Sequence, residues 1–345
     1  RRKLLTPPLH GDILRSYVPA IEAATHSARA SWPSDSPVRM LDAGRDLTLD
    51  VIVQVIFGVH AAEDIERLGK PFADLLDLAL STETPIRYAA RRLGTLRSWG
   101  TLRDVNRRID AVVLPLIARR RATAERGRAT DVLSMLVDAR GEDGDQLSDN
   151  EIRADVITLM LAGHETTATT LAWLVDLLAH HPDVQRRVRA EIGTGRTDYT
   201  EAVINETLRL RPPAPITGRM TAEKYRLGDY TLPAGTRIVL LLDAINRDPE
   251  TYPDPDTFDP ERFVGTRPNP YGWVPFGGGI KRCIGASFSM CELSTILHTM
   301  LAQAELRPAS RRPESPATHA APVIVPRHGA QVYVSPLSRP VEASA

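Results

Sequence analysis

The sequence has little cysteine and no net charge. Its 345 residues include only two cysteines, Cys283 and Cys291, which argues against a scaffold of structural disulfides and favours a reducing compartment. Lysine and arginine together number 43, as do aspartate and glutamate. This balance gives no reason to expect nucleic acid as a partner. A chain of this length can bury a sizeable core as one domain or two.

Several widespread motifs are also missing. The sequence contains no CxxC pair, no GxGxxG loop, no internal repeat, and no flavin or ferredoxin module. Its glycine run does not complete a phosphate loop, and the zinc-protease pattern HExxH fails at Ala168. A secretory leader is not visible, so we expect a cytoplasmic protein. Because the chain starts at Arg1 rather than Met, the sequence leaves open an anchor segment outside it.

One stretch, residues 276–285, reads FGGGIKRCIG and places Cys283 where a glycine-rich loop enters a helical pattern. The start of a helix and the neighbouring cations Lys281 and Arg282 favour a thiolate. The glycines permit positive φ and close approach to a flat partner. This pattern indicates a thiolate offered to a soft electrophile or a metal. A small buried cysteine beside an ordinary turn is the alternative reading.

A second stretch predicts a long buried helix. Ser148 and Glu151 form a capping box, and a nearly continuous apolar run follows over residues 156–178. His164 and Glu165 within this run, with Asp176, argue against a membrane span. The polar set 162–167, AGHETT, therefore lies mid-helix in a core and needs hydrogen-bond partners. We expect a locally opened helix beside a ligand to supply them.

Weaker patterns follow in the second half. Glu206 and Arg209 form ExxR on a predicted helix, a spacing that occurs on many surface helices, and residues 260–263 read PERF. The proline-rich residues 211–219 are predicted to be extended. Residues 223–243 predict small hairpins, and residues 323–334 a further hairpin turning at His328 and Gly329.

The four motifs AGHETT, ExxR, PERF and FxxGxxxCxG, in this order, resemble those of the cytochromes P-450, of the bacterial type. The resemblance covers the chain from Arg1 to about Val334. It implies a mainly α fold with small β sheets (α+β), a long buried central helix and a cysteine-ligated haem. It also implies one domain over residues 1–334, without the first quarter of the family's chain. Residues 335–345 are expected to form a disordered tail.

By this resemblance the cofactor is haem b, with the Cys283 thiolate as the ligand of its iron. Lys281 stands where the family usually has His or Arg, so a point charge replaces a fork as partner of a haem propionate. Arg2 and Arg219 are further propionate candidates. The cofactor-binding residues implied are Cys283, Phe276, Gly277, Lys281, Gly285, Ala162, Arg219 and Arg2.

The resemblance also assigns roles to residues outside the cysteine loop. Glu165 and Thr166 match the family's acid–threonine pair, which handles the two protons that cleavage of dioxygen requires. Glu206, Arg209 and Arg262 match a structural lock, in which Arg262 would offer a planar fork. Substrate-facing positions implied by the match are Thr158, Leu161, Ile216 and Thr217.

The implied activity is that of a haem-thiolate monooxygenase. One oxygen atom from O2 enters an apolar organic substrate, and the electrons come from a separate partner, a ferredoxin or a flavoprotein reductase. We expect a monomer. Two alternatives stay open: a non-catalytic haem-binding remnant, and a haem-thiolate isomerase or peroxygenase that needs no electron donor. An intact acid–threonine pair argues against the isomerase or peroxygenase.

Overall fold

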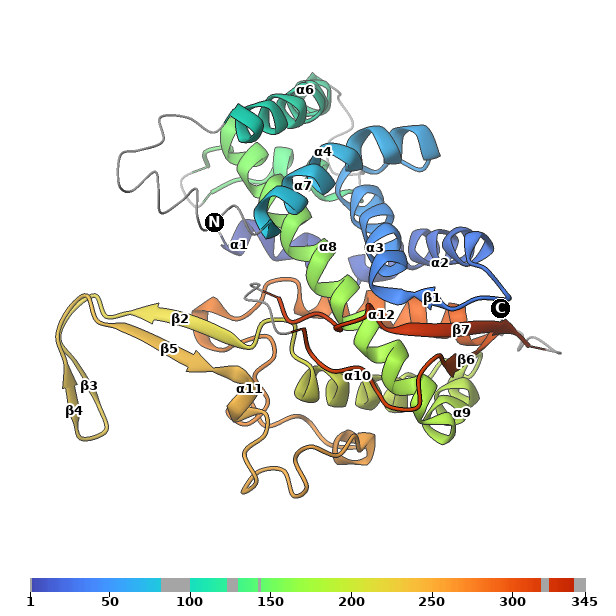
Figure 1. The fold of residues 1–345 in the computed structure, drawn as a ribbon. Helices are drawn as coiled ribbons and strands as arrows, with labels where there is room; N and C mark the ends of the chain where they lie inside the picture. Colours follow the sequence, from blue (N-terminus) through green and yellow to red (C-terminus); the bar gives the residue numbers. More distant parts are fainter. Residues whose placement is uncertain (1, 82–99, 123–129, 142–143, 318–322, 338–345) are drawn as a thin grey trace. The chain divides into compact units, whose positions relative to one another are not determined.

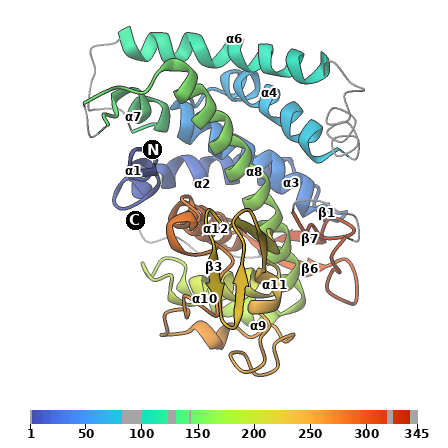
Figure 2. The same cartoon turned by 90° about the vertical axis from the view of Figure 1, so that its left-hand side faces the viewer.

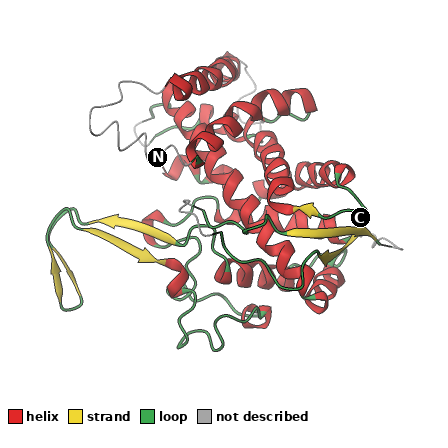
Figure 3. Cartoon of the chain, viewed as in Figure 1, coloured by secondary structure: helices red, strands yellow, loops and turns green. Residues whose placement is uncertain are grey.

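The structure is a computed structural model that describes residues 2–81, 100–122, 130–141, 144–317 and 323–337. Helices predominate, and the strands form small antiparallel sheets (Figure 3). Among the described residues, no helix combines the length and the apolar character needed to cross a membrane. The chain divides into two compact units. That these units form the single domain expected over residues 1–334 stays a prediction.

The first unit comprises Arg1–Pro33, Asp42–Ala168 and Ile284–Met300 and is helical. In α4, the buried side chains recur at helical spacing, at Leu68, Phe72, Leu75 and Leu76, and α4 runs alongside α6 (Figure 2). The helices that lie wholly or mostly in this unit are α1 (Arg2–Leu5), η1 (Pro7–Leu9), α2 (Ile13–Ser31), α3 (Met40–Phe57), α4 (Ala62–Leu80), α6 (Gly100–Ala122), α7 (Val132–Asp138) and α12 (Ala286–Leu301).

The long central helix is α8 (Asp149–His180), which contributes residues to both units. Its start is the capping box expected from the sequence. The Ser148 amide and hydroxyl donate to Glu151 Oε2 at 2.9 and 2.8 Å, and the Glu151 amide donates back to Ser148 Oγ at 3.3 Å. Pro182 is the first residue of α9 (Pro182–Glu191). Proline suits this position because the amide proton that it lacks would have no partner in the first turn of the helix.

The second unit comprises Ser34–Leu41, Thr169–Cys283 and Leu301–Ala345 and contains every strand described. One antiparallel sheet has the order β1-β7-β6, from β1 (Val38–Arg39), β7 (Gln331–Pro336) and β6 (Ala304–Pro308). A second pairs β2 (Ile216–Met220) with β5 (Arg237–Leu241), and the hairpin of β3 (Tyr225–Leu227) and β4 (Tyr230–Leu232) continues from it (Figure 1). The helices are α10 (Asp198–Leu210), α11 (Leu242–Ile245), η2 (Pro260–Phe263) and η3 (Gly279–Lys281), with α9.

The hairpin expected over residues 323–334 is wrong in its pairing. Gly329 does turn the chain, with φ +82°, but β7 beyond it pairs with β1 and β6. Pro326 before the turn lacks the amide proton that a ladder needs, and it forms only an isolated bridge, with Pro316. Strand β7 extends to Pro336, inside the tail expected to be disordered, and residues 338–345 of that tail lie outside the described residues.

Candidate functional site

One face of α8 carries small, exposed side chains. Ala154, Thr158 and Ala162 follow at intervals of four residues and are exposed, and Leu161 and Thr166 beside them are half-buried. The two hydroxyls are bonded back into the helix, since Thr158 Oγ1 donates to the Ala154 carbonyl at 2.8 Å and Thr166 Oγ1 to the Ala162 carbonyl at 2.6 Å. The predicted residues Thr158, Leu161, Ala162 and Thr166 therefore share one open face of a helix that is otherwise largely buried.

Glu165, next to Thr166, is held by an arginine that the sequence motifs did not include. Arg45 on α3 donates from Nε to Glu165 Oε2 at 2.8 Å and from Nη2 to Oε1 at 2.5 Å. The Glu165 side chain is 3% exposed and that of Arg45 is 33% exposed. These hydrogen bonds raise the pKa of Arg45, although burial opposes the rise. The predicted acid is thus a buried carboxylate in a bidentate fork.

The neighbouring His164 is tied to the same turn of α3. Its Nε2 donates to the Arg45 carbonyl at 2.8 Å, and Thr48 Oγ1 donates to the His164 carbonyl at 3.2 Å. Burial lowers the pKa of His164, so its ring is neutral near pH 7. One turn of α3 therefore satisfies the polar groups of two successive motif residues.

These ties overturn the expectation of a locally opened helix. Helix α8 continues without interruption through residues 162–167. The expectation assumed that the buried polar groups needed a ligand or a broken helix as partner. Arg45 and Thr48 on α3 instead supply the partners from outside the helix, so the backbone of α8 keeps its regular form.

In the second unit, Glu206 and Arg209 form a fully buried ion pair on α10. Arg209 Nε donates to Glu206 Oε2 at 2.6 Å and Nη2 to Oε1 at 2.8 Å, and both side chains are 0% exposed. The other Arg209 hydrogens go to the carbonyls of Asn246 (3.0 Å), Pro255 (2.7 Å) and Thr257 (3.1 Å). All five guanidinium donors are therefore used.

Arg262 joins this pair more loosely than the sequence suggested. Its Nε lies 3.6 Å from Glu206 Oε1, and its Nη2 donates to the Asp254 carbonyl at 3.1 Å. The planar fork expected from Arg262 is supplied by Arg209. Burial raises the pKa of Glu206, and the hydrogen bonds from Arg209 limit the rise.

The buried pair is connected to the segment that leads to Cys283. Asn246, whose carbonyl accepts from Arg209, also accepts through Oδ1 from the Val274 amide at 3.0 Å. Trp273 donates from Nε1 to the Asn205 carbonyl at 3.0 Å, and its ring meets Phe276 edge-on with centroids 5.8 Å apart. Helix α10 therefore positions the base of the cysteine loop through hydrogen bonds and ring packing.

Within the loop, Cys283 is exposed and its amide donates to the Phe276 carbonyl at 2.8 Å. Gly277 and Gly279 have φ of +67° and +63°, which side chains other than glycine rarely adopt. The glycines of the loop Phe276–Gly285 are Gly277, Gly278, Gly279 and Gly285. A Cβ placed on any of them would meet no atom within 4 Å among those described. The loop is thus closed by its own backbone hydrogen bond and open on its glycine side.

The remaining predicted residues lie at the surface of their units. Ile216, Thr217 and Arg219 all lie on β2. Ile216 is exposed, Thr217 and Arg219 are half-buried, and Arg219 Nη1 donates to Thr217 Oγ1 at 3.1 Å. Lys281 is exposed in η3, and Arg2 is exposed in α1. The structure brings together the α8 residues in one unit, and the buried ion pair, Phe276 and Cys283 in the other.

Sequence reasoning missed two charged residues, Arg45 and Glu292. Arg45 follows the spacing of the buried α3 residues Leu41, Thr48 and Ile52, so a charge at an expected apolar position was a usable signal. Glu292 on α12 is 1% exposed, and neither carboxyl oxygen has a hydrogen bond among the described residues. Burial raises its pKa to about 8; the Thr167 hydroxyl opposes the rise without reaching hydrogen-bond geometry.

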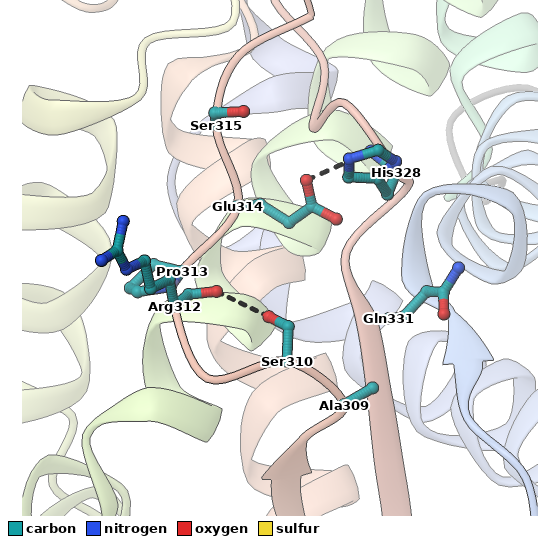
Figure 4. Close-up of a pocket in the computed structure, with 8 residues that line it drawn as sticks. All are labelled: Ala309, Ser310, Arg312, Pro313, Glu314, Ser315, His328 and Gln331. Carbon is teal, nitrogen blue, oxygen red and sulfur yellow. Dashed lines mark hydrogen bonds between the residues drawn. The ribbon is translucent and has the colours of Figure 1, made fainter.

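Two cavities lie away from the predicted residues. One, of about 370 Å³, is formed by the segments beside β6 and β7, where the Glu314 carboxylate accepts from the His328 amide (Figure 4). The other, of about 570 Å³, is lined by α2, α3 and α4 and includes Asp46 and Asp50. Burial raises the pKa of Asp50 to about 6. None of the predicted site residues lines either cavity.

Comparison with known proteins identifies relatives of this chain. The family model described as Cytochrome P450 matches residues 1–334. Cytochrome P450 137 of Mycobacterium tuberculosis, a provisional name, is 56% identical over 97% of this chain and 70% of its own length. Cytochrome P450 138 of Mycobacterium bovis, also named provisionally, is 36% identical over 87% of this chain and 68% of its own.

A solved structure shares the fold. The retinoic-acid-bound cyanobacterial CYP120A1 superimposes with a TM-score of 0.82, at 24% sequence identity, over 98% of this chain and 78% of its own. The expected fold class, mainly α with small β sheets, is confirmed. The family supports a haem iron cofactor and an oxidoreductase of the monooxygenase type. The match over nearly the whole chain and the close relatives show that this protein belongs to the cytochrome P450 family.

Proposed function

We propose that the chain is a haem-thiolate monooxygenase that binds haem b through Cys283 and oxygenates an apolar organic substrate. The observation that carries the proposal is the exposed Cys283 thiol on a glycine loop whose base is tied to a buried ion pair. Such a loop presents sulfur from a rigid support, which a metal ligand requires.

The residues of the loop fit a flat iron-bearing group. The open side of its glycines leaves room for close approach of a planar ring. Lys281 and Arg282 are exposed cations beside the sulfur, suited to a thiolate and to the carboxylates of haem. Among the described residues, no group of three or more His, Cys, Asp or Glu side chains offers a rival metal site.

The residues proposed to hold the haem are those of the cysteine loop, three cations and one residue of α8. Cys283 would ligate the iron, Phe276 would pack near the sulfur, and Gly277 and Gly285 would line the ring. Lys281, Arg219 and Arg2 are the candidates for its propionates, and Ala162 belongs to the open face of α8. When bound, haem with a thiolate ligand supplies the iron at which O2 is activated.

Glu165 and Thr166 are proposed to manage protons. Monooxygenation adds one oxygen atom of O2 to the substrate and releases the other as water, which consumes two electrons and two protons. Thr166 is positioned on the open face of α8, where its hydroxyl can hold a water molecule. Glu165 is adjacent and can carry protons as a carboxylate.

Glu206, Arg209 and Arg262 are proposed as a scaffold rather than as catalytic groups. Arg209 donates to the carbonyls of Asn246, Pro255 and Thr257, and Arg262 to that of Asp254, and these contacts support the role because they hold irregular chain in place. Thr158 and Leu161 on α8 and Ile216 and Thr217 on β2 are the proposed substrate-facing positions. We expect the electrons to come from a separate ferredoxin or flavoprotein reductase.

The two cysteines provide a matched test of haem ligation. The purified chain, supplied with haem, is reduced and exposed to carbon monoxide, and its difference spectrum is recorded. We expect a thiolate-type band in the unchanged chain and in Cys291→Ser, since Cys291 lies half-buried on α12. Cys283→Ser should lose the band. A band absent from the unchanged chain, or retained in Cys283→Ser, would refute the proposal.

The proton role is tested by the yield of product per O2 consumed. Thr166→Ala should divert electrons to peroxide and lower this yield several-fold. Thr295→Ala is the control, because Thr295 Oγ1 also donates to the carbonyl four residues before it, at 2.8 Å, but lies on α12. An equal yield in Thr166→Ala and in the unchanged chain would contradict the role of Thr166.

A further inference from the structure

The cavity lined by α2, α3 and α4 lies wholly within the first unit. Its volume of about 570 Å³ falls in the range of about 300–1,000 Å³ that small-molecule sites occupy. The more deeply buried part of its lining is largely apolar, because Ala24 and Gly69 are buried and Leu49 and Ile65 are half-buried. Packing is close there, since a Cβ on Gly69 would lie 3.3 Å from the Leu49 side chain. This part of the lining offers a hydrocarbon chain a well-packed surface.

Three carboxylates share the cavity with these apolar groups. Asp46 and Asp50 are one helical turn apart on α3, and Glu66 lies on α4. Asp46 and Glu66 are exposed, whereas Asp50 is half-buried. Burial and the negative charge of Asp46 raise the pKa of Asp50 to about 6. Among the described residues, the Asp50 carboxylate forms neither a hydrogen bond nor an ion pair. Near pH 7 it is therefore a half-buried anion without a partner in the described part of the chain.

The other polar groups of the lining do not neutralise this charge. Lys70 on α4 is the one lysine or arginine that lines the cavity; its side chain is exposed, and it forms no ion pair with another described residue. His60 Nδ1 donates to Gln54 Oε1 at 3.3 Å, so these two side chains partner each other. Three acids against one lysine leave the lining negative.

These features select the kind of ligand. An anion would be repelled, and a neutral apolar molecule would deepen the burial of the Asp50 charge without pairing it. A metal ion needs several ligands that converge, and no such group of His, Cys, Asp and Glu occurs in the described part of the chain. An organic cation meets both demands, because its charge pairs with a carboxylate and its hydrocarbon part contacts the apolar lining.

We propose that this cavity binds a small organic amine, whose ammonium group pairs with Asp50 and whose hydrocarbon chain packs against Leu49 and Ile65. A second ammonium group on the same chain would meet the exposed carboxylates Asp46 and Glu66. The site lies outside the residues proposed for monooxygenation and does not depend on haem. A bound amine would contact α2, α3 and α4 together and would raise the stability of the chain by mass action.

The first test is calorimetric titration of the purified chain with hexane-1,6-diamine and with its uncharged analogue hexane-1,6-diol. The diamine should bind at least tenfold more tightly, and it should raise the thermal midpoint where the diol does not. Asp50→Asn keeps the shape and removes a buried charge, so it should fold and lose diamine affinity at least tenfold. The control is Asp74→Asn, since Asp74 lies on α4 but outside the lining, and its affinity should equal that of the unchanged chain.

Two further variants test the place of binding. Ala23 is exposed on α2 and lines the cavity, so Ala23→Leu fills part of the volume with a side chain that favours a helix. Its affinity for the diamine should fall several-fold. Lys70→Met removes the competing cation and should raise the affinity several-fold. The opposite order of these two variants would overturn the assignment to this cavity.

The third test is the pH dependence of binding. Between pH 7.5 and pH 5 Asp50 takes up a proton while the amine stays charged, so the affinity should fall about tenfold. The titratable and charged side chains that line the cavity with Asp50 are Asp46 on α3, His60 between α3 and α4, and Glu66 and Lys70 on α4; α2 contributes none. The fall should persist in His60→Gln and shrink in Asp50→Asn. A fall that disappears in His60→Gln would contradict the role of Asp50.

The outcomes also separate this site from the proposed haem site, because an amine nitrogen can ligate iron. Cys283→Ser should bind the diamine as tightly as the unchanged chain. Loss of binding in Cys283→Ser, equal affinity for diamine and diol, or full affinity in Asp50→Asn would each overturn the proposal. If the thiolate-type band is absent, the haem-thiolate function fails, whereas the titrations still decide whether the cavity binds an amine.

Discussion

Two arginine–glutamate pairs with nearly the same hydrogen bonds occupy very different surroundings. The pair of Arg209 and Glu206 is 0% exposed on both sides, and every guanidinium donor has an acceptor. The pair of Arg45 and Glu165 buries its carboxylate equally well but leaves the arginine 33% exposed. Opening the first pair strands two charges in the core, whereas opening the second returns one of them to water.

The two pairs also differ in how much of the chain each arginine holds. The Arg209 pair uses its extra donors to hold the carbonyls of residues 246, 255 and 257, so its free energy is distributed over the chain that leads to Cys283. The Arg45 guanidinium donates its two hydrogen bonds to a single carboxylate, that of Glu165. The first pair therefore holds several stretches of irregular backbone, and the second holds a single side chain.

A third buried acid, Glu292, has no hydrogen bond from an arginine among the described residues. Its side chain is as inaccessible as those of Glu165 and Glu206, and burial raises its pKa to about 8. Near pH 7 it is therefore a neutral acid.

The largest effect is expected from Arg209→Met. It leaves Glu206 buried without a cation and removes the hydrogen bonds to three carbonyls, so the free energy of unfolding should fall by about 3–5 kcal/mol. Urea unfolding measures this loss. The thiolate-type band should weaken in parallel, because the cysteine loop loses its anchor. A loss below about 1 kcal/mol would mean that this pair is no scaffold.

Glu292→Gln should remove a pH dependence rather than a contact. Because the folded pKa is raised, its contribution to stability is complete below about pH 4.3 and is lost as pH rises toward 8. Between pH 6.5 and 8 the unchanged chain should lose up to about 1.4 kcal/mol per pH unit relative to Glu292→Gln. Asp50, with a pKa of about 6, remains in both proteins and cancels. Parallel stability curves would disprove the raised pKa.

Arg262→Ala should cost less than Arg209→Met. Arg262 lies 3.6 Å from Glu206 and donates one hydrogen bond, to the Asp254 carbonyl. We expect a loss of about 1 kcal/mol in the free energy of unfolding, read from the urea midpoint. A loss equal to that of Arg209→Met would show that both arginines share the anchoring role.

Arg187→Ala gives the lower limit of the series. Arg187 pairs with Glu261 at the surface of the same unit, where both side chains are about half exposed. Exposed pairs contribute roughly 0–1 kcal/mol, and salt screens them. The thermal midpoint of Arg187→Ala should therefore differ little from that of the unchanged chain, and the difference should vanish at high salt. A larger loss would mean that exposure does not distinguish these pairs.

Much of the fold follows from local patterns. The capping box at Ser148 marks the start of α8, and Pro182 opens α9, because both signals act through neighbouring backbone groups. Glu206 and Arg209 share a face of α10 through their spacing alone. The cysteine loop could be located for the same reason, since its glycines and Cys283 lie within ten consecutive residues.

Contacts between distant segments could not be predicted in this way. Arg45 lies 120 residues before Glu165, and no local pattern pairs them. The same applies to β7, which pairs with β1 and β6 instead of with the segment before its turn. The expectation of an opened helix around Glu165 was wrong because no local pattern shows that α3 supplies the partner of this carboxylate. Partners from another element decide whether a buried polar motif distorts its own helix.

The open face of α8 has a consequence for evolution of the protein. Ala154, Thr158 and Ala162 are exposed, while the side chains that secure α8 to α3 lie at other positions of the helix. Exchanging a small side chain here for a larger one would add volume outside the packed core. Variation at Ala154 and Thr158 can therefore proceed at little cost in folding.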